Sequence, residues 1–372
     1  MRVGWVCTYV PEELIHAAGF LPYRLAPGEN GQHGNCKMLP PNFCPFVRQL
    51  GEDFEKGCLD FLDGIVLASS CNAMIHLYNI IKDRIRTSQF IYLLDVPRKS
   101  DDASKTYFKE QLKNLGTFLA KQNGYDIDTS LPGSIALYAK TQSYLEKINY
   151  NYHLITNDQW RFFLDLSRQP REKINEQLDL MINNEIASTE LEEKPQTTSS
   201  FSFETLGLPD DKNNAVVLLT GGIPSPELLT ALEDTKVHPI LMENCMGLRY
   251  LLKDRMFKDW QVLGSLSKES LYSFLAKSYL EKLSCPRTFS QSNFTGNGRQ
   301  KDLKQLTRLF NIKAVIHHDL NFCDLSNYDY LYLHDFFNAS NTPVLRLKTE
   351  LSKAEIGQIK TRVEAFYEMN LL

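Results

Sequence analysis

Short apolar runs alternate with stretches of helical periodicity over the first hundred residues of the chain. The apolar run Gly64–Ala68 ends at two serines and Cys71. After it, Met74, Leu77 and Ile81 recur at helical spacing. A continuous apolar strand followed by a helix is typical of a parallel sheet that is covered on both faces. The pattern therefore predicts an N-terminal α/β lobe, with further strands over residues 3–7, 20–25 and 90–96 and a helix over residues 11–19.

The strand pattern is absent from about Lys99 to Ser188, where amphipathic helices are predicted over residues 107–124 and 171–187. A polar stretch containing Pro, Ser and Thr follows, as in a surface linker. The alternation then restarts, because Ala215–Glu233 reads as a strand, a Gly-containing turn and a helix. Further strands are predicted over residues 238–245, 313–318 and 342–348, and a helix over residues 301–310.

These elements predict an α/β fold with two doubly wound, Rossmann-like (flavodoxin-like) lobes, each with a parallel sheet, joined by a helical segment. A weak internal repeat agrees with two related lobes, since Cys44-Pro45 and Cys285-Pro286 each precede a strand that ends near another cysteine. The expected boundaries are 1–100 for the N-terminal lobe, 101–190 for the helical segment, 191–212 for the linker and 213–372 for the C-terminal lobe.

Composition narrows the class of partners. The chain has 372 residues, 43% of them hydrophobic and 23% charged, as in a soluble globular protein of two domains. Its net charge of −4 gives no case for a nucleic-acid or membrane-surface partner. No stretch approaches the roughly 18 uncharged apolar residues of a membrane span, and Pro11, Glu12 and Glu13 interrupt the apolar start in a way that signal peptides do not. We expect a cytoplasmic protein.

The eight cysteines are the main candidates for chemistry, and four of them come within a few residues after a predicted strand. Doubly wound sheets bind ligands at the carboxyl ends of their strands. Two further cysteines precede prolines in loops before helices, so six thiols would converge if the lobes face each other. The six are Cys7, Cys44, Cys71, Cys245, Cys285 and Cys323. A site rich in thiolates and poor in oxygen ligands favours an iron–sulfur cluster, zinc or copper(I).

A packing role is the alternative for each cysteine taken alone, because free cysteine behaves as a small, buried apolar residue. Cys36 and Cys58 fit that role best. Arg98 and Arg249 are candidates to contact an anionic group, and one histidine of the pair 317–318 is a candidate to approach the cysteines. The Tyr-rich stretch over residues 327–337 is expected to be core at helical spacing. The sequence identifies no catalytic acid or base.

Seven segments carry a family resemblance in their order along the chain. They are VPEELIHAAGFLPYRL (10–25), FCPFVRQLG (43–51), DGIVLASSCNAM (63–74), LLDVPR (93–98), VVLLTGGIPSPELL (216–229), MENCMGLRYL (242–251) and KAVIHHDLNFC (313–323). Together they resemble the benzoyl-CoA reductase and 2-hydroxyacyl-CoA dehydratase superfamily. The resemblance implies two Rossmann-like lobes with an iron–sulfur cluster between them. It also implies a partner, a homodimeric ATP-hydrolysing activator with its own [4Fe-4S] cluster, which injects low-potential electrons one at a time.

Two branches of this superfamily differ in how many cysteines they use. Dehydratase subunits hold one cubane on three cysteines, which by match are Cys44, Cys71 and Cys323. Double-cubane cluster proteins hold a bridged [8Fe-9S] cluster on six. The start CTYVPEEL is similar to that branch, and the other three ligands would be Cys7, Cys245 and Cys285.

The resemblance to the double-cubane branch implies an iron–sulfur reductase that is driven by the ATPase, acts on a small-molecule substrate and forms a homodimer. One alternative is the [4Fe-4S] subunit of a 2-hydroxyacyl-CoA dehydratase. The other is a two-lobed binding or structural protein without a cluster.

Overall fold

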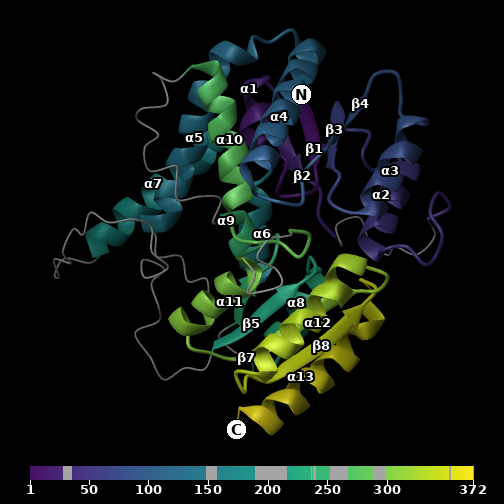
Figure 1. Cartoon of the computed structure of the whole chain (residues 1–372), viewed down its shortest axis with the longest axis vertical. Coiled ribbons are helices and arrows are strands. Elements are labelled where there is room, and N and C mark those ends of the chain that lie inside the picture. The colour runs from purple at the N-terminus through teal and green to yellow at the C-terminus, as the bar shows by residue number, and fades with distance from the viewer. Residues whose placement is uncertain are drawn as a thin grey trace.

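The computed structural model describes residues 1–27, 36–147, 157–188, 216–235, 237, 240–251, 267–288, 298–351 and 353–371. These residues form two four-stranded parallel sheets with helices around them, as the sequence predicts (Figure 1). The linker expected at 191–212 lies outside the described residues, and the domain boundaries stay a prediction. No helix in the described part of the chain combines the length and the apolar stretch that a membrane span needs.

The first sheet has the strand order β2-β1-β3-β4, with all neighbours parallel. Its strands are β1 (Arg2–Trp5), β2 (Leu21–Arg24), β3 (Gly64–Ala68) and β4 (Phe90–Leu94). Three helices connect them: α1 (Glu12–Ala17), α2 (Pro45–Glu55) and α3 (Asn72–Lys82). The strand order reverses direction at β1, between β2 and β3, which is the switch point where doubly wound sheets place their ligands.

The second sheet repeats this topology with the order β6-β5-β7-β8, again all parallel. Its strands are β5 (Val216–Gly221), β6 (Ile240–Glu243), β7 (Ile312–Leu320) and β8 (Val344–Thr349). Its helices are α8 (Pro226–Glu233), α9 (Leu248–Leu251), α11 (Gly298–Leu309), α12 (Asp324–Asn338) and α13 (Ile356–Asn370), with a short 3-10 turn at Lys353–Glu355. The equal strand order gives the weak sequence repeat a structural counterpart.

The remaining helices are α4 (Asp102–Asn123), α5 (Ile127–Lys147), α6 (Asn157–Leu166), α7 (Arg171–Ser188) and α10 (Lys268–Glu281). Helix α4 packs on β4, α5 packs on α1 and α7, and α6 packs on α8 of the C-terminal lobe. Local signals delimit α4, because the Asp101 side chain accepts a hydrogen bond from the Ser104 amide and Gly124 ends the helix in the left-handed conformation. Helix α10 follows the second sheet's β6 in sequence, yet it packs against α4 and α5 (Figure 1). One continuous apolar core therefore spans both lobes, including Trp5 and Tyr250.

The expectation that residues 327–337 form core is wrong for one face of α12. Leu333 and Phe337 are buried. In contrast, Tyr328, Leu331 and Tyr332 are 68%, 58% and 60% exposed. Helix α12 packs on β7 and β8 along one side, so only the residues on that stripe reach the core. Helical spacing identifies such a stripe, but aromatic content alone does not say which residues belong to it.

Candidate functional site

Six of the eight cysteines lie at the start of a helix or shortly after a strand or helix. Three of them occupy the N-cap positions of α2, α3 and α12; they are Cys44, Cys71 and Cys323. The other three follow β1, β6 and α10; they are Cys7, Cys245 and Cys285. Cys44 is buried and the other five are half-buried. The structure thus places these residues where the sequence predicted them relative to the strands, while their role as ligands stays a prediction.

Cys44, Cys71 and Cys323, here called the first thiol set, border an apolar cluster built around α2 and α3. A hydrogen bond joins the thiols of Cys44 and Cys323; it lowers the pKa of Cys44 and raises the pKa of Cys323 well above its ordinary value. Burial raises the pKa of Cys71 to about 11, and Cys323 raises it as well. The first thiol set therefore combines two cysteines of the N-terminal lobe with one of the C-terminal lobe.

Helix N-termini converge on this first thiol set. Backbone N–H groups in the first turns of α2, α3 and α12, among them those of Val47, Met74 and Ser326, lower the pKa of the three thiols. Each helix N-terminus carries roughly half a positive charge and favours a thiolate over a thiol. The backbone alone thus prepares this part of the site for negative charge.

Cys7, Cys245 and Cys285, here called the second thiol set, lie on the side of the large core. Cys7 and Cys285 pack against that core, which contains residues of both lobes. Burial raises the pKa of the Cys7 thiol, and Cys245 raises it further. Burial likewise raises the pKa of Cys285, with Arg249 opposing and Cys245 adding to that effect. The three sulfurs are therefore close enough to influence one another's charge.

The two thiol sets are adjacent, because Cys7 is one of the groups that raise the pKa of Cys71, after burial and Cys323. Cys36 and Cys58 stand apart: the charged groups that act on Cys36 are Glu55 and Arg48, after burial and local backbone amides. Within the described ranges, no three His, Cys, Asp or Glu side chains are arranged around a single metal ion. A multi-iron cluster spreads its ligands over several metal atoms, so its thiolates need not surround one point.

Four buried cations border the second thiol set; they are Arg24, Arg249, Lys282 and Arg287. The Arg24 guanidinium donates a hydrogen bond of 2.6 Å to the Cys245 carbonyl. Lys282 donates from Nζ to Thr8 Oγ1 at 2.9 Å, next to Cys7. Arg249, the candidate to contact an anionic group, forms a bidentate pair with Glu243 at 2.5 and 2.9 Å. Part of its positive charge is therefore already balanced by this carboxylate. Arg98 is exposed.

Three of these cations, Arg24, Lys282 and Arg287, were not predicted from the sequence as parts of the site. A usable signal existed for Arg24, because it stands on the buried face of its strand, and a buried charge requires a specific partner. A second signal was the position of Arg287, two residues after Cys285. The order of residues does not show which groups such cations face across the lobes.

Histidines 317 and 318 are fully buried on β7, and both find partners within the C-terminal lobe. The His317 ring lies 3.2 Å from Asp319 and 3.6 Å from Asp329. Burial lowers its pKa, but the two carboxylates outweigh burial and raise the pKa above its ordinary value. His318 Nε2 is 2.8 Å from Thr349 Oγ1, and burial lowers its pKa to about 4. These two side chains belong to the polar interior of the lobe.

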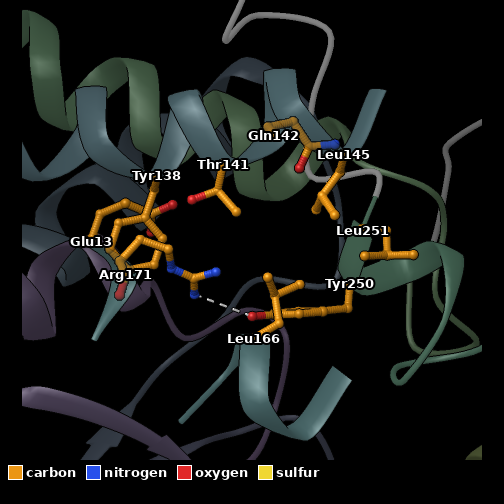
Figure 2. A pocket seen from close by; sticks show the side chains of 9 residues that line it. All are labelled: Glu13, Tyr138, Thr141, Gln142, Leu145, Leu166, Arg171, Tyr250 and Leu251. Atoms are coloured by element: carbon orange, nitrogen blue, oxygen red, sulfur yellow. Dashed lines mark hydrogen bonds between the residues drawn. The ribbon is translucent and has the colours of Figure 1, made fainter. Parts of the chain in front are cut away.

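A small cavity lies between α5, α6, α7 and α9, and the Tyr250 side chain is among those that line it (Figure 2). Arg171 points into it and donates hydrogen bonds to Glu12 at 3.0 Å and to the Tyr250 hydroxyl at 3.4 Å. Glu13 and Leu166 also line it. Its volume of about 20 Å³ has room for a water molecule or two, but not for an organic substrate. This cavity is therefore structural rather than a substrate pocket.

Comparison with known proteins connects this architecture to a family. A sequence model of the family described as 2-hydroxyglutaryl-CoA dehydratase, D-component, matches residues 7–370. The chain belongs to this family. The resemblance read from the seven sequence segments is thereby confirmed. Membership places the chain among enzymes of the 2-hydroxyacyl-CoA dehydratase type, which also confirms the prediction of an enzyme at that level.

Several curated proteins are similar to the chain at low identity. The chain is 27% identical to one of the subunits of the benzoyl-CoA reductase of Thauera aromatica over 164 residues, 43% of this chain and 41% of that protein. It is 23% identical over 373 residues to the beta subunit of lactoyl-CoA dehydratase of Anaerotignum propionicum, 99% of this chain and 91% of that protein. It is also 23% identical over 384 residues to the beta subunit of (R)-2-hydroxyglutaryl-CoA dehydratase of Acidaminococcus fermentans, 98% of this chain and 91% of that protein.

Proposed function

We propose that this dehydratase-type subunit is an iron–sulfur reductase that holds a low-potential cluster between its two lobes. In this proposal the ligands are the two thiol sets, Cys7, Cys44, Cys71, Cys245, Cys285 and Cys323. The observation that carries the proposal is the adjacency of the sets through Cys7 and Cys71, with sulfurs from both lobes acting on one another's charge. Ordinary packing of separate core cysteines gives no reason for such convergence.

The donor chemistry fits an iron–sulfur cluster. Six soft sulfur donors in a site with few oxygen ligands favour such a cluster over hard cations. Burial raises the pKa of Cys7, Cys71 and Cys285, so these thiols are protonated without a metal and would release their protons when they bind one. When bound, the cluster would supply storage for electrons at low potential. The protein residues would hold it, keep water away and balance its negative charge.

The number of cysteines favours the larger cluster. In an [8Fe-9S] double cubane, two cubanes share a bridging sulfide, and each has three further irons that need a terminal ligand. Three thiolates on each side meet that need, and each thiol set has three members.

The remaining parts of the proposal concern partners. A homodimeric ATP-hydrolysing activator with its own [4Fe-4S] cluster would deliver electrons, and the substrate would be a small molecule that reaches the cluster between the lobes. We place the protein in the cytoplasm as a homodimer. The family match over residues 7–370 supports the activator and the small-molecule substrate.

A second candidate is favoured by the names of the relatives. Three of them are beta subunits of dehydratases that act on lactoyl-CoA, (R)-phenyllactyl-CoA and (R)-2-hydroxyglutaryl-CoA. On that basis the chain would hold one [4Fe-4S] cluster on the first thiol set, pair with a non-identical subunit and act on an acyl-CoA.

The deciding experiment is the content of iron and acid-labile sulfide per chain in protein purified without oxygen. About eight irons support the double cubane on six cysteines. About four irons move the assignment to the dehydratase subunit with three ligands. Protein without iron, after assembly with iron and sulfide under anaerobic conditions, contradicts both proposals and returns the cysteines to a packing role.

A further inference from the structure

Two buried guanidinium groups beside the second thiol set have only backbone carbonyls, and no carboxylate, as hydrogen-bond acceptors among the described residues. Arg24 on β2 is completely buried, and its Nη2 donates to the Cys245 carbonyl at 2.6 Å. Its Nε and Nη1 atoms have no hydrogen-bond partner among the described residues. The rings of Trp5 and Tyr250 lie 4.8 and 5.1 Å from the guanidinium carbon. These rings supply contact area but no full negative charge.

Arg287 occupies the corresponding place on the other lobe, two residues after Cys285. It is 1% exposed and donates hydrogen bonds to three backbone carbonyls of the N-terminal lobe, those of Ser70, Val96 and Pro97. The nearby Asp95 carboxylate accepts hydrogen bonds from Ser69 and Tyr107, and Arg287 is a further group that lowers its pKa. Arg287 therefore joins the lobes through neutral acceptors, and none of its hydrogen bonds goes to a carboxylate.

A buried charge without a counter-charge is strongly unfavourable, and arginine cannot lose its proton to escape this cost. Both guanidiniums face the second thiol set. Negative charge at Cys245 and Cys7 would stabilise the positive charge of Arg24. In the same way, the positive charge of Arg287 would stabilise negative charge at Cys285. The Glu12 carboxylate also acts on Arg24, but it accepts hydrogen bonds from Arg171 and Tyr250. A negative group held by the three sulfurs would complete the balance of charge.

The first thiol set has a different electrostatic environment. Helix N-termini face its three sulfurs, each with only a partial positive charge. The charged side chain that acts on Cys323 is the carboxylate of Asp319, which opposes further negative charge there. Positive charge is thus concentrated on the side of Cys7, Cys245 and Cys285.

We infer that Arg24 and Arg287 are counter-charges that raise the reduction potential of the half-site formed by Cys7, Cys245 and Cys285, so that an added electron resides there. This inference rests on the proposed function, because it requires a cluster that extends over both thiol sets. It makes the two arginines positioning residues for charge, and it makes the two halves of the site unequal.

The test uses the full chain, purified without oxygen, and measures iron content together with the midpoint potential of the first one-electron reduction. In Arg24→Met we expect the cluster to bind an electron at least tenfold less tightly, which lowers the potential by about 59 mV for one electron. Arg24→Lys keeps the charge and should retain the wild-type potential. Arg168→Met is the matched control. Arg168 is a half-buried cation that stacks on Tyr23 at 4.5 Å and donates a hydrogen bond to the Arg24 carbonyl at 2.8 Å, so its loss removes a neighbouring charge and a contact with β2 without changing the Arg24 guanidinium.

The outcomes separate the two proposals. Wild-type protein with about four irons or none contradicts the six-cysteine site itself. If wild-type protein holds about eight irons, an Arg24→Met variant with full iron and an unchanged potential, or one shifted no further than Arg168→Met, overturns the role of Arg24. Loss of about half the iron in Arg24→Met supports the role, because that loss follows from an unbalanced second half-site. If Arg24→Met holds no iron, an Arg24→Lys variant with wild-type iron and potential supports the role, and loss of iron in both overturns it.

Discussion

The thiol of Cys44 in the N-terminal lobe is hydrogen-bonded to the thiol of Cys323 in the C-terminal lobe, although 279 positions (323 minus 44) separate them in sequence. Each of the two caps the start of a helix that packs on its own sheet. The contact is therefore a product of how the lobes face each other, and it brings sulfur from both lobes to the centre of the first thiol set.

Replacing a member of the first thiol set should remove the cluster, whereas replacing a packing cysteine should not. We expect Cys71→Ser and Cys323→Ser to lose iron and sulfide, since either change removes a soft ligand that both cluster assignments share. Cys58→Ser is the control, because Cys58 lies outside the two thiol sets and follows α2. Iron analysis of the three anaerobic preparations checks this. Equal iron in all three would contradict the assignment.

The second thiol set distinguishes the two candidate functions. If six cysteines hold a double cubane, Cys245→Ser should lower iron from about eight to about four per chain, since the second half-site loses one of its three ligands. If only the first thiol set binds a cubane, the same variant should retain all of its iron. The folded state of the variant is checked by its circular dichroism spectrum, so that unfolding is not mistaken for loss of a ligand.

Buried histidine 318 should make the C-terminal lobe sensitive to acid. Burial lowers its pKa from 6.5 to about 4, so the unfolded chain binds a proton in this pH range that the folded chain does not. The stabilisation is present above pH 6.5 and is lost as the pH falls towards 4, by about 3 kcal/mol in all. Urea unfolding of the wild type and His318→Gln between pH 7.5 and 4.5 measures it, and the difference between the two should fall with pH.

The adjacent His317 is the reason to compare with a variant rather than to follow the wild type alone. Its two carboxylate neighbours raise its pKa, so its contribution is complete below pH 6.5 and is lost as the pH rises through the raised value. The two histidines thus act in opposite directions on the pH dependence of the wild type. A stability difference between wild type and His318→Gln that does not change with pH would contradict the assignment to His318.

Much of the fold follows from local patterns in the sequence. The predicted strand Gly64–Ala68 coincides with β3, and the positions of Cys71 and Cys323 after their strands follow from the same reading. An apolar run is a property of neighbouring residues, so it identifies a strand without knowledge of the rest of the fold. Arg24 illustrates what local patterns do not contain: its environment comes from Trp5, Tyr250 and the Cys245 carbonyl, two of which are more than 200 positions away in sequence. Tyr332 shows the same limit, because only packing decides which face of α12 is buried.

A glycine at the end of β5 should be irreplaceable for a backbone reason. Gly221 has a φ of +100°, where side chains are strained, and a Cβ there would lie 2.3 Å from the His318 carbonyl oxygen on β7. We expect Gly221→Ala to lower the free energy of unfolding by roughly 3 kcal/mol or more, because the clash is with backbone that cannot turn away. Urea or thermal unfolding checks this value.

The matched control is Gly133→Ala in the middle of α5, where a Cβ would meet nothing within 4 Å. Alanine is the better helix former, so this variant should be more stable by about 0.5–1 kcal/mol. Opposite signs for the same chemical change would show that the cost at Gly221 comes from its conformation and its contact with β7. A Gly221→Ala protein as stable as Gly133→Ala would mean that the strand end shifts to accept a side chain, and that the register between β5 and β7 is not fixed at this point.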